Sequence, residues 1–177
     1  PNGSSIHKNL IGKFKNEVKR QGALPFVRHH NIKYGGQFPI WVAVELFTFG
    51  MLGSLFDLMR ENDQRAVSRE YNLSPESLSR LIASAVDVRN ICAHYNRLYN
   101  RVLDDQPLLP NRLRLYESDR LFPLLLAFAH ILGRERVLNR LITGLSLLEA
   151  DFPEADLSLC GFPEDWRSIL EAEAAQA

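Results

Sequence analysis

Eleven consecutive residues near the middle of the chain, from Asp87 to Arg97, bring together side chains that could move a proton beside a bound phosphate. They include two arginines, of which the first is Arg89, one histidine, His94, and the asparagine Asn90. A histidine exchanges a proton near neutral pH, and an arginine holds a phosphate in a fixed geometry. The combination therefore predicts acid–base chemistry on a phosphate group.

The surrounding sequence predicts that this stretch lies inside one long helix. Ser74 and Pro75 form a helix start signal, and no Gly or Pro follows until Pro107. Apolar residues then recur at alternating steps of four and three, the pattern of one continuous buried seam. The seam consists of Leu81, Ala85, Val88, Cys92, Tyr95, Tyr99 and Val102. We therefore expect a single helix over residues 75–103, with Cys92 as a packed thiol.

The polar residues of the same stretch would lie on the side of this helix opposite the seam, because a helix turns by about 100° per residue. This polar stripe consists of Asp87, Asn90, His94, Arg97 and Arg101. Composition alone favours a solvated face, whereas a histidine between two arginines also fits proton transfer beside a phosphate. Asn90 could donate to a phosphate oxygen or orient the imidazole.

Arg89 does not belong to the stripe, since it lies about 140° around the helix axis from His94. Either its long side chain wraps around the helix, or a second helix supplies another copy of the motif. The second alternative predicts a homodimer in which two copies of the motif share one cleft.

The remaining segments carry helical patterns, and no stretch alternates with the period of two that marks a strand. We expect an all-α fold, a helical bundle in which one long central helix carries the Arg89–His94 motif. After a flexible start over residues 1–5, a helix is predicted from Ile6 to Gln21, with an apolar stripe at every fourth residue: Ile6, Leu10, Phe14 and Val18. The other predicted helices are Pro39 to Glu61, Asp63 to Tyr71, Asp119 to Leu132, Arg134 to Glu149 after a break at Gly133, and Trp166 to Ala174. Pro123 either lies in the first turn of its helix or bends it. We divide the chain into an N-terminal helix and loop, residues 1–38, and a helical domain, residues 39–177.

Residues 25–39 contain two prolines and a Gly-Gly pair, so we expect a loop that could include a short helix. The densest positive cluster outside the central stretch lies here and consists of Arg28, His29, His30 and Lys33. The alternatives are a solvated loop and a loop that contacts phosphate through these basic side chains.

The apolar run from Ile40 to Met59 contains Glu45 and Asp57, so it fits a buried core helix and not a membrane span. A buried Glu45 would need a partner, and an arginine of the central stretch is a candidate. His130 lies in an apolar helix and is expected to be a core or edge histidine with its hydrogen bonding satisfied.

Net charge and cysteine content limit the kinds of site that the chain can carry. The 177 residues carry a formal net charge of zero, so any basic surface for nucleic acid must be local. Cys92 and Cys160 form neither a disulfide framework nor a metal-ligand spacing, which fits a reducing cytoplasm. We expect no metal and no cofactor.

Because the chain begins at Pro1 without an initiator Met or a signal peptide, we expect a fragment or a processed form.

A resemblance to known proteins follows from these residues. Arg89-Asn90-x-x-x-His94 resembles the Arg-(polar)-x-x-x-His motif of the HEPN superfamily of ribonucleases. The longer string from Arg89 to Arg101 resembles the signature of the Abi-like family (AbiD/AbiF type) of bacterial abortive-infection proteins. Three further stretches agree with this family in order and spacing, namely Pro39-Ile40-Trp41-Val42 with Glu45, Phe49-Gly50-x-Leu52, and Gly161-Phe162-Pro163-x-x-Trp166. Full-length members carry a longer N-terminal part that we expect this chain to lack.

The resemblance implies a dimeric helical bundle that cuts RNA without a metal ion and leaves a 2′,3′-cyclic phosphate. It implies that His94 acts as general base on the ribose 2′-hydroxyl or as general acid on the 5′-oxygen. Arg89 would stabilise the negative charge that develops on phosphorus, and Asn90 would orient phosphate or imidazole. The residues expected to hold RNA phosphates are Arg97, Arg101, Arg28 and Lys33. RNA and a second copy of the chain are the expected partners, with an antitoxin protein or a small RNA as a candidate silencer.

Two other functions are the alternatives. One is a catalytically silent protein of the same fold that binds RNA or a partner protein. The other is a helix-turn-helix DNA-binding regulator, because residues 64–80 resemble such a unit, with Ser77 and Arg80 as reading residues. Against DNA reading, the second helix is expected to continue far beyond the few turns of a recognition helix, and the chain lacks net basicity.

Overall fold

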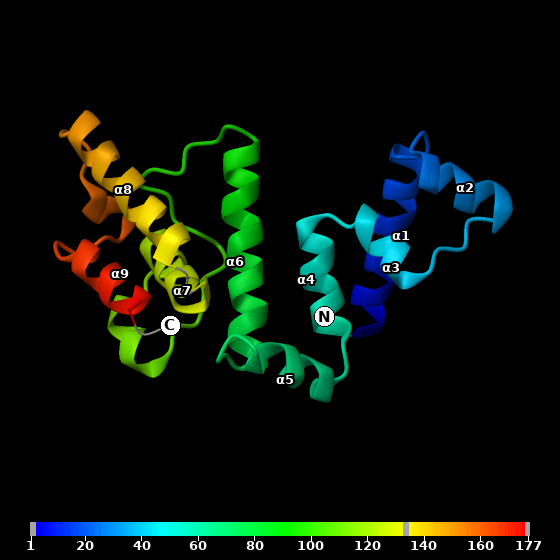
Figure 1. Ribbon diagram of the computed structural model, residues 1–177, viewed down its shortest axis with the longest axis horizontal. Helices are drawn as coiled ribbons and strands as arrows, with labels where there is room; N and C mark the ends of the chain where they lie inside the picture. Colours follow the sequence, from blue (N-terminus) through cyan, green and yellow to red (C-terminus); the bar gives the residue numbers. More distant parts are fainter. Residues whose placement is uncertain (1–2, 133–134, 176–177) are drawn as a thin grey trace. The chain divides into compact units, whose positions relative to one another are not determined.

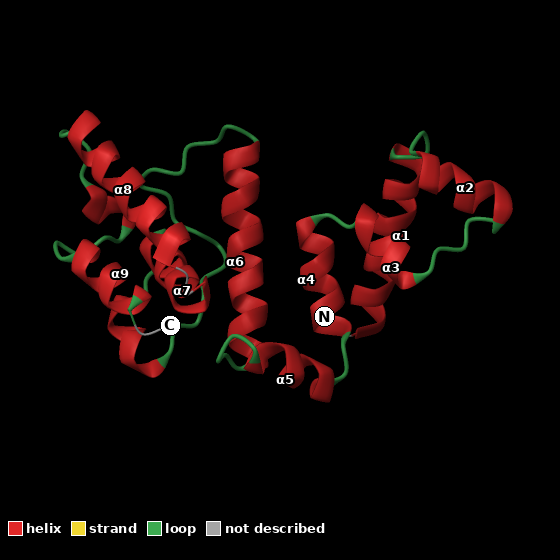
Figure 2. Cartoon of the chain, viewed as in Figure 1, coloured by secondary structure: helices red, strands yellow, loops and turns green. Residues whose placement is uncertain are grey.

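The computed structural model describes residues 3–132 and 135–175. Helices and their connections make up the whole of this described part, which holds no strand (Figure 2). The predicted all-α class is therefore confirmed. The chain divides into two compact units, residues 1–64 and 65–177, and each is described below by itself. The division of the sequence between residues 38 and 39 stays a prediction.

The first unit is built on a long amphipathic helix. Its elements are α1 (Gly3–Arg20), α2 (Pro25–Lys33), α3 (Ile40–Ala43), the short 3-10 helix η1 (Val44–Leu46) and α4 (Phe49–Leu58). α1 packs against α4 and η1. The predicted apolar stripe of α1 is confirmed, because Leu10 is buried and Ile6, Phe14 and Val18 are half-buried. Residues 3–5, expected to be a flexible start, are already helical.

The predicted single helix from Pro39 to Glu61 is wrong, because the chain forms α3, η1 and α4 there, with a break between η1 and α4. Phe47, between η1 and α4, has extended backbone angles of φ −74° and ψ 133°. Thr48, a residue type favoured at helix starts, occupies the N-cap position of α4. The break allows Leu46 before it and Met51 after it both to be buried.

This apolar run is also not the buried centre of the fold. Trp41 is 72% exposed, and Glu45 is exposed, so the carboxylate needs no buried partner. The expected burial of Glu45 is therefore wrong, and its pairing with an arginine of the central stretch stays a prediction. Among the described residues, no helix is both long enough and apolar enough to cross a membrane.

The second unit has its core around α7. Its elements are the end of α5 (Glu61–Arg69), α6 (Pro75–Ala93), η2 (Asn111–Tyr116), α7 (Phe122–Leu132), α8 (Glu135–Asp151), η3 (Leu157–Cys160) and α9 (Trp166–Ala174). α7 contacts α6, α8 and α9 (Figure 1) and buries Phe122, Leu124 and Leu126 almost completely. α7 begins at Phe122, three residues after the predicted start at Asp119, and Pro123 therefore lies in its first turn. The predicted break at Gly133 and the helix start at Arg134 lie outside the described residues.

A buried polar cluster holds α9 to the rest of this unit. The carboxylate of Glu173, 2% exposed, accepts hydrogen bonds from both terminal nitrogens of Arg112 and, at 2.8 Å, from Nδ1 of His130. His130 is thus the edge histidine that the sequence predicted, although its buried Nε2 has no hydrogen bond among the described residues. Burial alone would raise the pKa of Glu173, but the hydrogen bonds from Arg112 and His130 outweigh it and lower that pKa.

We expect Glu173→Gln to lower the free energy of unfolding by about 2 kcal/mol at pH 7, because Arg112 and His130 lose a charged acceptor. A carboxylate whose pKa is lowered by folding stabilises the fold above its ordinary pKa of 4.5 and stops doing so as the pH falls below it. The difference between wild type and variant in chemical denaturation should therefore shrink below about pH 4.5. An equal difference at pH 7 and pH 3 would contradict the ion-pair explanation.

Gly161 is required by a close contact in the second unit. It follows η3 with a left-handed φ of 83°, and a Cβ there would lie 2.7 Å from Cβ of Arg120. The neighbouring Phe162 and Trp166 are buried and stack edge-to-face, with ring centroids 5.7 Å apart. The stretch from Gly161 to Trp166 therefore serves to close the core of this unit.

We expect Gly161→Ala to destabilise the second unit by about 1–3 kcal/mol, since it adds both backbone strain and a clash. Gly144→Ala is the matched control, because a Cβ on this exposed residue of α8 meets nothing within 4 Å. That change should stabilise the protein by up to about 1 kcal/mol through helix propensity. Thermal unfolding of both variants measures the contrast, and a neutral Gly161→Ala would refute the close contact.

Candidate functional site

α6 positions the central motif, and its start follows the sequence. The Ser74 hydroxyl accepts a hydrogen bond from the backbone N–H of Ser77 at 3.0 Å, and Pro75 occupies the first turn. The helix buries the face that carries Leu78, Leu81, Ser84, Ala85 and Ile91. Its N-terminal signal and the first part of the predicted seam are therefore confirmed.

α6 ends at Ala93, ten residues before the predicted end at residue 103. The backbone N–H of Asn96 donates to the carbonyl of Ile91 at 3.0 Å, and that of Tyr95 donates to Cys92 at 3.1 Å. These two hydrogen bonds form a Schellman motif, in which the residue after the C-cap turns left-handed. Here that residue is Tyr95, with φ of 54° and a side chain 98% exposed.

The seam and the polar stripe consequently stop with the helix. Cys92 is exposed, so the prediction of a packed thiol is wrong. Arg97 and Arg101 lie on the following loop and not on a helix face with Asn90. No Gly or Pro marks this end in the sequence, which is why the helical pattern continued through it.

Contacts with the C-terminal half of the second unit hold the loop that follows His94. The Tyr99 hydroxyl donates to the carbonyl of Asp156 and accepts from its N–H, at 3.2 and 3.0 Å. Asn100 accepts from Arg120 at 2.9 Å, and the Leu103 N–H donates to the carbonyl of Asp119 at 2.8 Å. In Figure 1 the loop leaves the end of α6 and runs toward the connection between α8 and α9. A helix continued to residue 103 could not make these contacts.

The motif residues lie together at the C-terminal end of α6. His94 is the C-cap residue, and its backbone N–H donates to the carbonyl of Asn90 at 3.1 Å. Nη1 of Arg89 donates to Oδ1 of Asn90 at 3.0 Å, so the asparagine orients the arginine. Arg89 and His94 are both exposed, but no contact joins their side chains within the described chain.

The basic groups of the motif and its loop have few partners of their own. The side chains of His94, Arg97 and Arg101 are exposed and make no hydrogen bond or ion pair with any described residue. A surface arginine without a carboxylate partner keeps its donors available for an external anion. Arg89 uses one donor on Asn90 and keeps the others. This end of α6 is therefore suited to bind phosphate groups.

Arg28 and Lys33, the other predicted phosphate contacts, lie on α2 in the first unit. The segment predicted as a loop is thus mainly a helix of nine residues that begins at Pro25. Five residues separate the two basic side chains, which places them about 140° apart around the helix. The ammonium of Lys33 lies 5.6 Å from the ring centroid of Tyr34. Arg28 therefore faces a different side of α2 from Lys33.

The residues that DNA reading would need are engaged inside the chain. The N–H and hydroxyl of Ser77 both contact the Ser74 side chain, and Nε of Arg80 donates to the carbonyl of Gln106 at 3.0 Å. These contacts disfavour the helix-turn-helix regulator. No group of three or more His, Cys, Asp or Glu side chains in the described ranges has an arrangement that could hold a metal ion.

We expect Tyr95→Gly to raise the free energy of unfolding by about 1 kcal/mol, because glycine adopts the left-handed conformation without steric cost. Asn100→Gly is the comparison, since asparagine tolerates its φ of 53° and its amide also accepts from Arg120. That second change should not stabilise the protein. Chemical denaturation distinguishes the two, and a destabilised Tyr95→Gly would contradict the left-handed turn.

A comparison with protein families places the chain in one of them. The model of a family described as "Abi-like protein" matches residues 2–100, which is more than half of the chain. The matched region contains Arg89, Asn90, His94 and Arg97, and it ends one residue before Arg101. No curated protein and no solved structure gives a significant match. On the extent of the family match, the chain belongs to the Abi-like protein family.

Proposed function

We propose that this Abi-like protein is a metal-independent endoribonuclease of the HEPN type that acts in antiphage abortive infection or as a toxin. Membership of the Abi-like family fits a role in abortive infection. The observation that carries the proposal is the group of exposed basic residues at the end of α6, whose side chains have almost no partner inside the described chain. An RNA strand supplies the phosphates that such a surface binds.

The proposed reaction is an attack by the ribose 2′-oxygen on the adjacent phosphorus. A general base removes the 2′-hydroxyl proton, the new O2′–P bond forms, and the P–O5′ bond breaks. A general acid gives a proton to the departing 5′-oxygen, so the products are a 2′,3′-cyclic phosphate and a 5′-hydroxyl. His94 supplies one of these proton transfers, and Arg89 stabilises the negative charge on the phosphoryl oxygens.

Asn90 acts on this reaction through Arg89. Its Oδ1 accepts from Nη1 of Arg89 at 3.0 Å and limits the directions in which the guanidinium points. Its amide N–H groups are left to donate to a phosphate oxygen. Arg97 and Arg101 then hold the neighbouring phosphates from a loop that the contacts of Tyr99 keep in place. Arg28 and Lys33 on α2 are additional phosphate contacts.

The proposed active form is a homodimer. The reaction needs one group that takes a proton and another that gives one, whereas the motif of one chain contains only one histidine. A second copy supplies the second His94, and it also brings a second Arg89 to the same cleft. An antitoxin protein or a small RNA that covers this surface is the proposed means of control.

Substitution of His94 by alanine should reduce cleavage of total RNA by at least about 100-fold, because a general acid–base group contributes about 10²–10⁴ in rate. Arg89→Ala should also reduce cleavage strongly, since it removes the charge stabilisation. His7→Ala and Arg114→Ala, both exposed and outside the motif, are the matched controls and should leave the rate unchanged. The assay detects the 2′,3′-cyclic phosphate ends in a buffer that contains a metal chelator.

The same assay tests the shared cleft. Wild-type chains mixed with an excess of His94→Ala chains should lose most of their activity, because a mixed dimer contains only one of the two histidines that the reaction needs. Cleavage that is undiminished in His94→Ala would overturn the catalytic assignment. RNA binding without cleavage by the wild-type protein would favour the catalytically silent alternative.

A further inference from the structure

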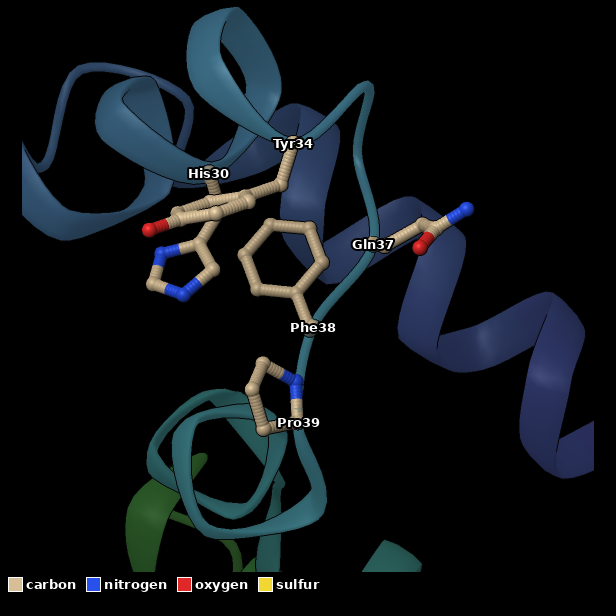
Figure 3. A pocket seen from close by; sticks show the side chains of 5 residues that line it. All are labelled: His30, Tyr34, Gln37, Phe38 and Pro39. Atoms are coloured by element: carbon tan, nitrogen blue, oxygen red, sulfur yellow. The ribbon is translucent and has the colours of Figure 1, made fainter.

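The first unit contains a cavity that the proposed reaction does not use. It has a volume of about 510 Å³ and is lined by His30, Tyr34, Gln37, Phe38 and Pro39 (Figure 3). Its lining comes from the end of α2 and from the connection to α3, within one compact unit. The volume lies within the range of small-ligand sites, which is about 300–1,000 Å³.

Three aromatic rings line one side of this cavity. The rings of His30 and Phe38 are stacked, with centroids 5.1 Å apart and planes inclined by 17°. The ring of Tyr34 lies 5.4 Å from that of His30. Figure 3 shows the three rings gathered together while Gln37 points away from them. Tyr34 is 48% exposed, so part of this residue is accessible to a ligand.

Contacts behind the rings hold them in place. Nδ1 of His30 donates a hydrogen bond to the carbonyl of Phe26 at 2.8 Å. The other ring nitrogen, Nε2, takes no part in this bond. Phe38 packs edge-to-face against Phe14 of α1 at 5.6 Å, and Phe14 also contacts the ring of Phe47. A ligand would therefore meet a preformed surface, which reduces the entropy lost on binding.

The charge beside the cavity favours an anionic ligand. The ammonium of Lys33 lies 5.6 Å from the centroid of Tyr34, and His29 lies against both His30 and Tyr34. A planar group stacked on Tyr34 would thus carry its anionic substituent close to Lys33. Aromatic faces beside a cation are the usual platform for an unpaired nucleobase and its phosphate.

We propose that this cavity binds one unpaired base of an RNA strand, with Tyr34 and Phe38 as the stacking surfaces and Lys33 as the contact to the adjacent phosphate. The proposal rests on the proposed function and deepens it. It names a second point, distinct from the bond that is cut, at which single-stranded RNA is bound. Stacking on aromatic rings accepts any base, so the site predicts a preference for unpaired RNA and not for a sequence.

The test measures binding of a fluorescent 12-nucleotide single-stranded RNA to the full chain carrying His94→Ala, so that the RNA stays intact. Adding Tyr34→Ala should weaken binding at least about fivefold, because stacking of one base is lost. Tyr34→Phe keeps the ring and should bind normally. Ile32→Ala, at a 74% exposed neighbour on α2 outside the cavity, is the matched control and should also bind normally.

An abasic strand of the same length separates stacking from phosphate attraction. It keeps every phosphate but offers no base, so Tyr34→Ala should not weaken its binding further. Equal binding of the intact RNA by wild type and Tyr34→Ala, or an equal loss for both strands, would overturn the proposal. Stronger competition by free adenosine monophosphate than by an unlabelled strand of the same RNA would assign the cavity to free nucleotides and would also overturn it.

Cleavage by chains with native His94 keeps the two proposals distinct. If wild type and Tyr34→Ala cleave equally and bind equally, the base site fails while the ribonuclease stands. If the wild type never cleaves but binds RNA through Tyr34, the ribonuclease fails while the base site stands. Absence of any RNA binding would overturn the base site whatever the cleavage result.

Discussion

Tyr95 adopts a left-handed backbone conformation, which costs an L-residue of its size about 1–2 kcal/mol. The position of the whole motif depends on this turn, because it ends α6 at Ala93 and leaves His94 at the exposed tip. Nothing in the local sequence favours the turn. The loop after it makes several hydrogen bonds with distant segments, each worth about 1 kcal/mol net, and together these offset the strain.

Most of the fold could be predicted where local signals and packing agree. The Ser74 cap, the stripe of α1 and the early position of Pro123 in α7 each follow from short-range chemistry that tertiary contacts do not oppose. The errors share one cause. The end of α6 depends on contacts with residues far away in the chain, and the break at Phe47 depends on burial on both sides of a turn. The spacing of apolar residues in the sequence reports neither of these.

The candidate site, like the fold, could be predicted only in part from the sequence. The residue types of the motif were identified from the sequence, but their supposed common helix face was not real, because Arg97 and Arg101 follow the turn. The aromatic cavity was missed since residues 25–39 were expected to be mostly loop. In a helix, the four-residue step from His30 to Tyr34 places both rings on one face, and the interleaved aromatic and basic residues were the available signal.

The segments beyond the family match explain how the motif is held. The match ends at residue 100, yet Asn100 accepts from Arg120, and its N–H contacts the sulfur of Cys160 at 3.4 Å. A side chain at position 161 would clash with the side chain of Arg120. The glycine that closes the core therefore also keeps Arg120 in reach of the motif loop. A loop anchored at both Asp156 and Arg120 can present its arginines without a helix beneath them. The C-terminal half therefore supports the loop, and the end of α6 is the proposed functional surface.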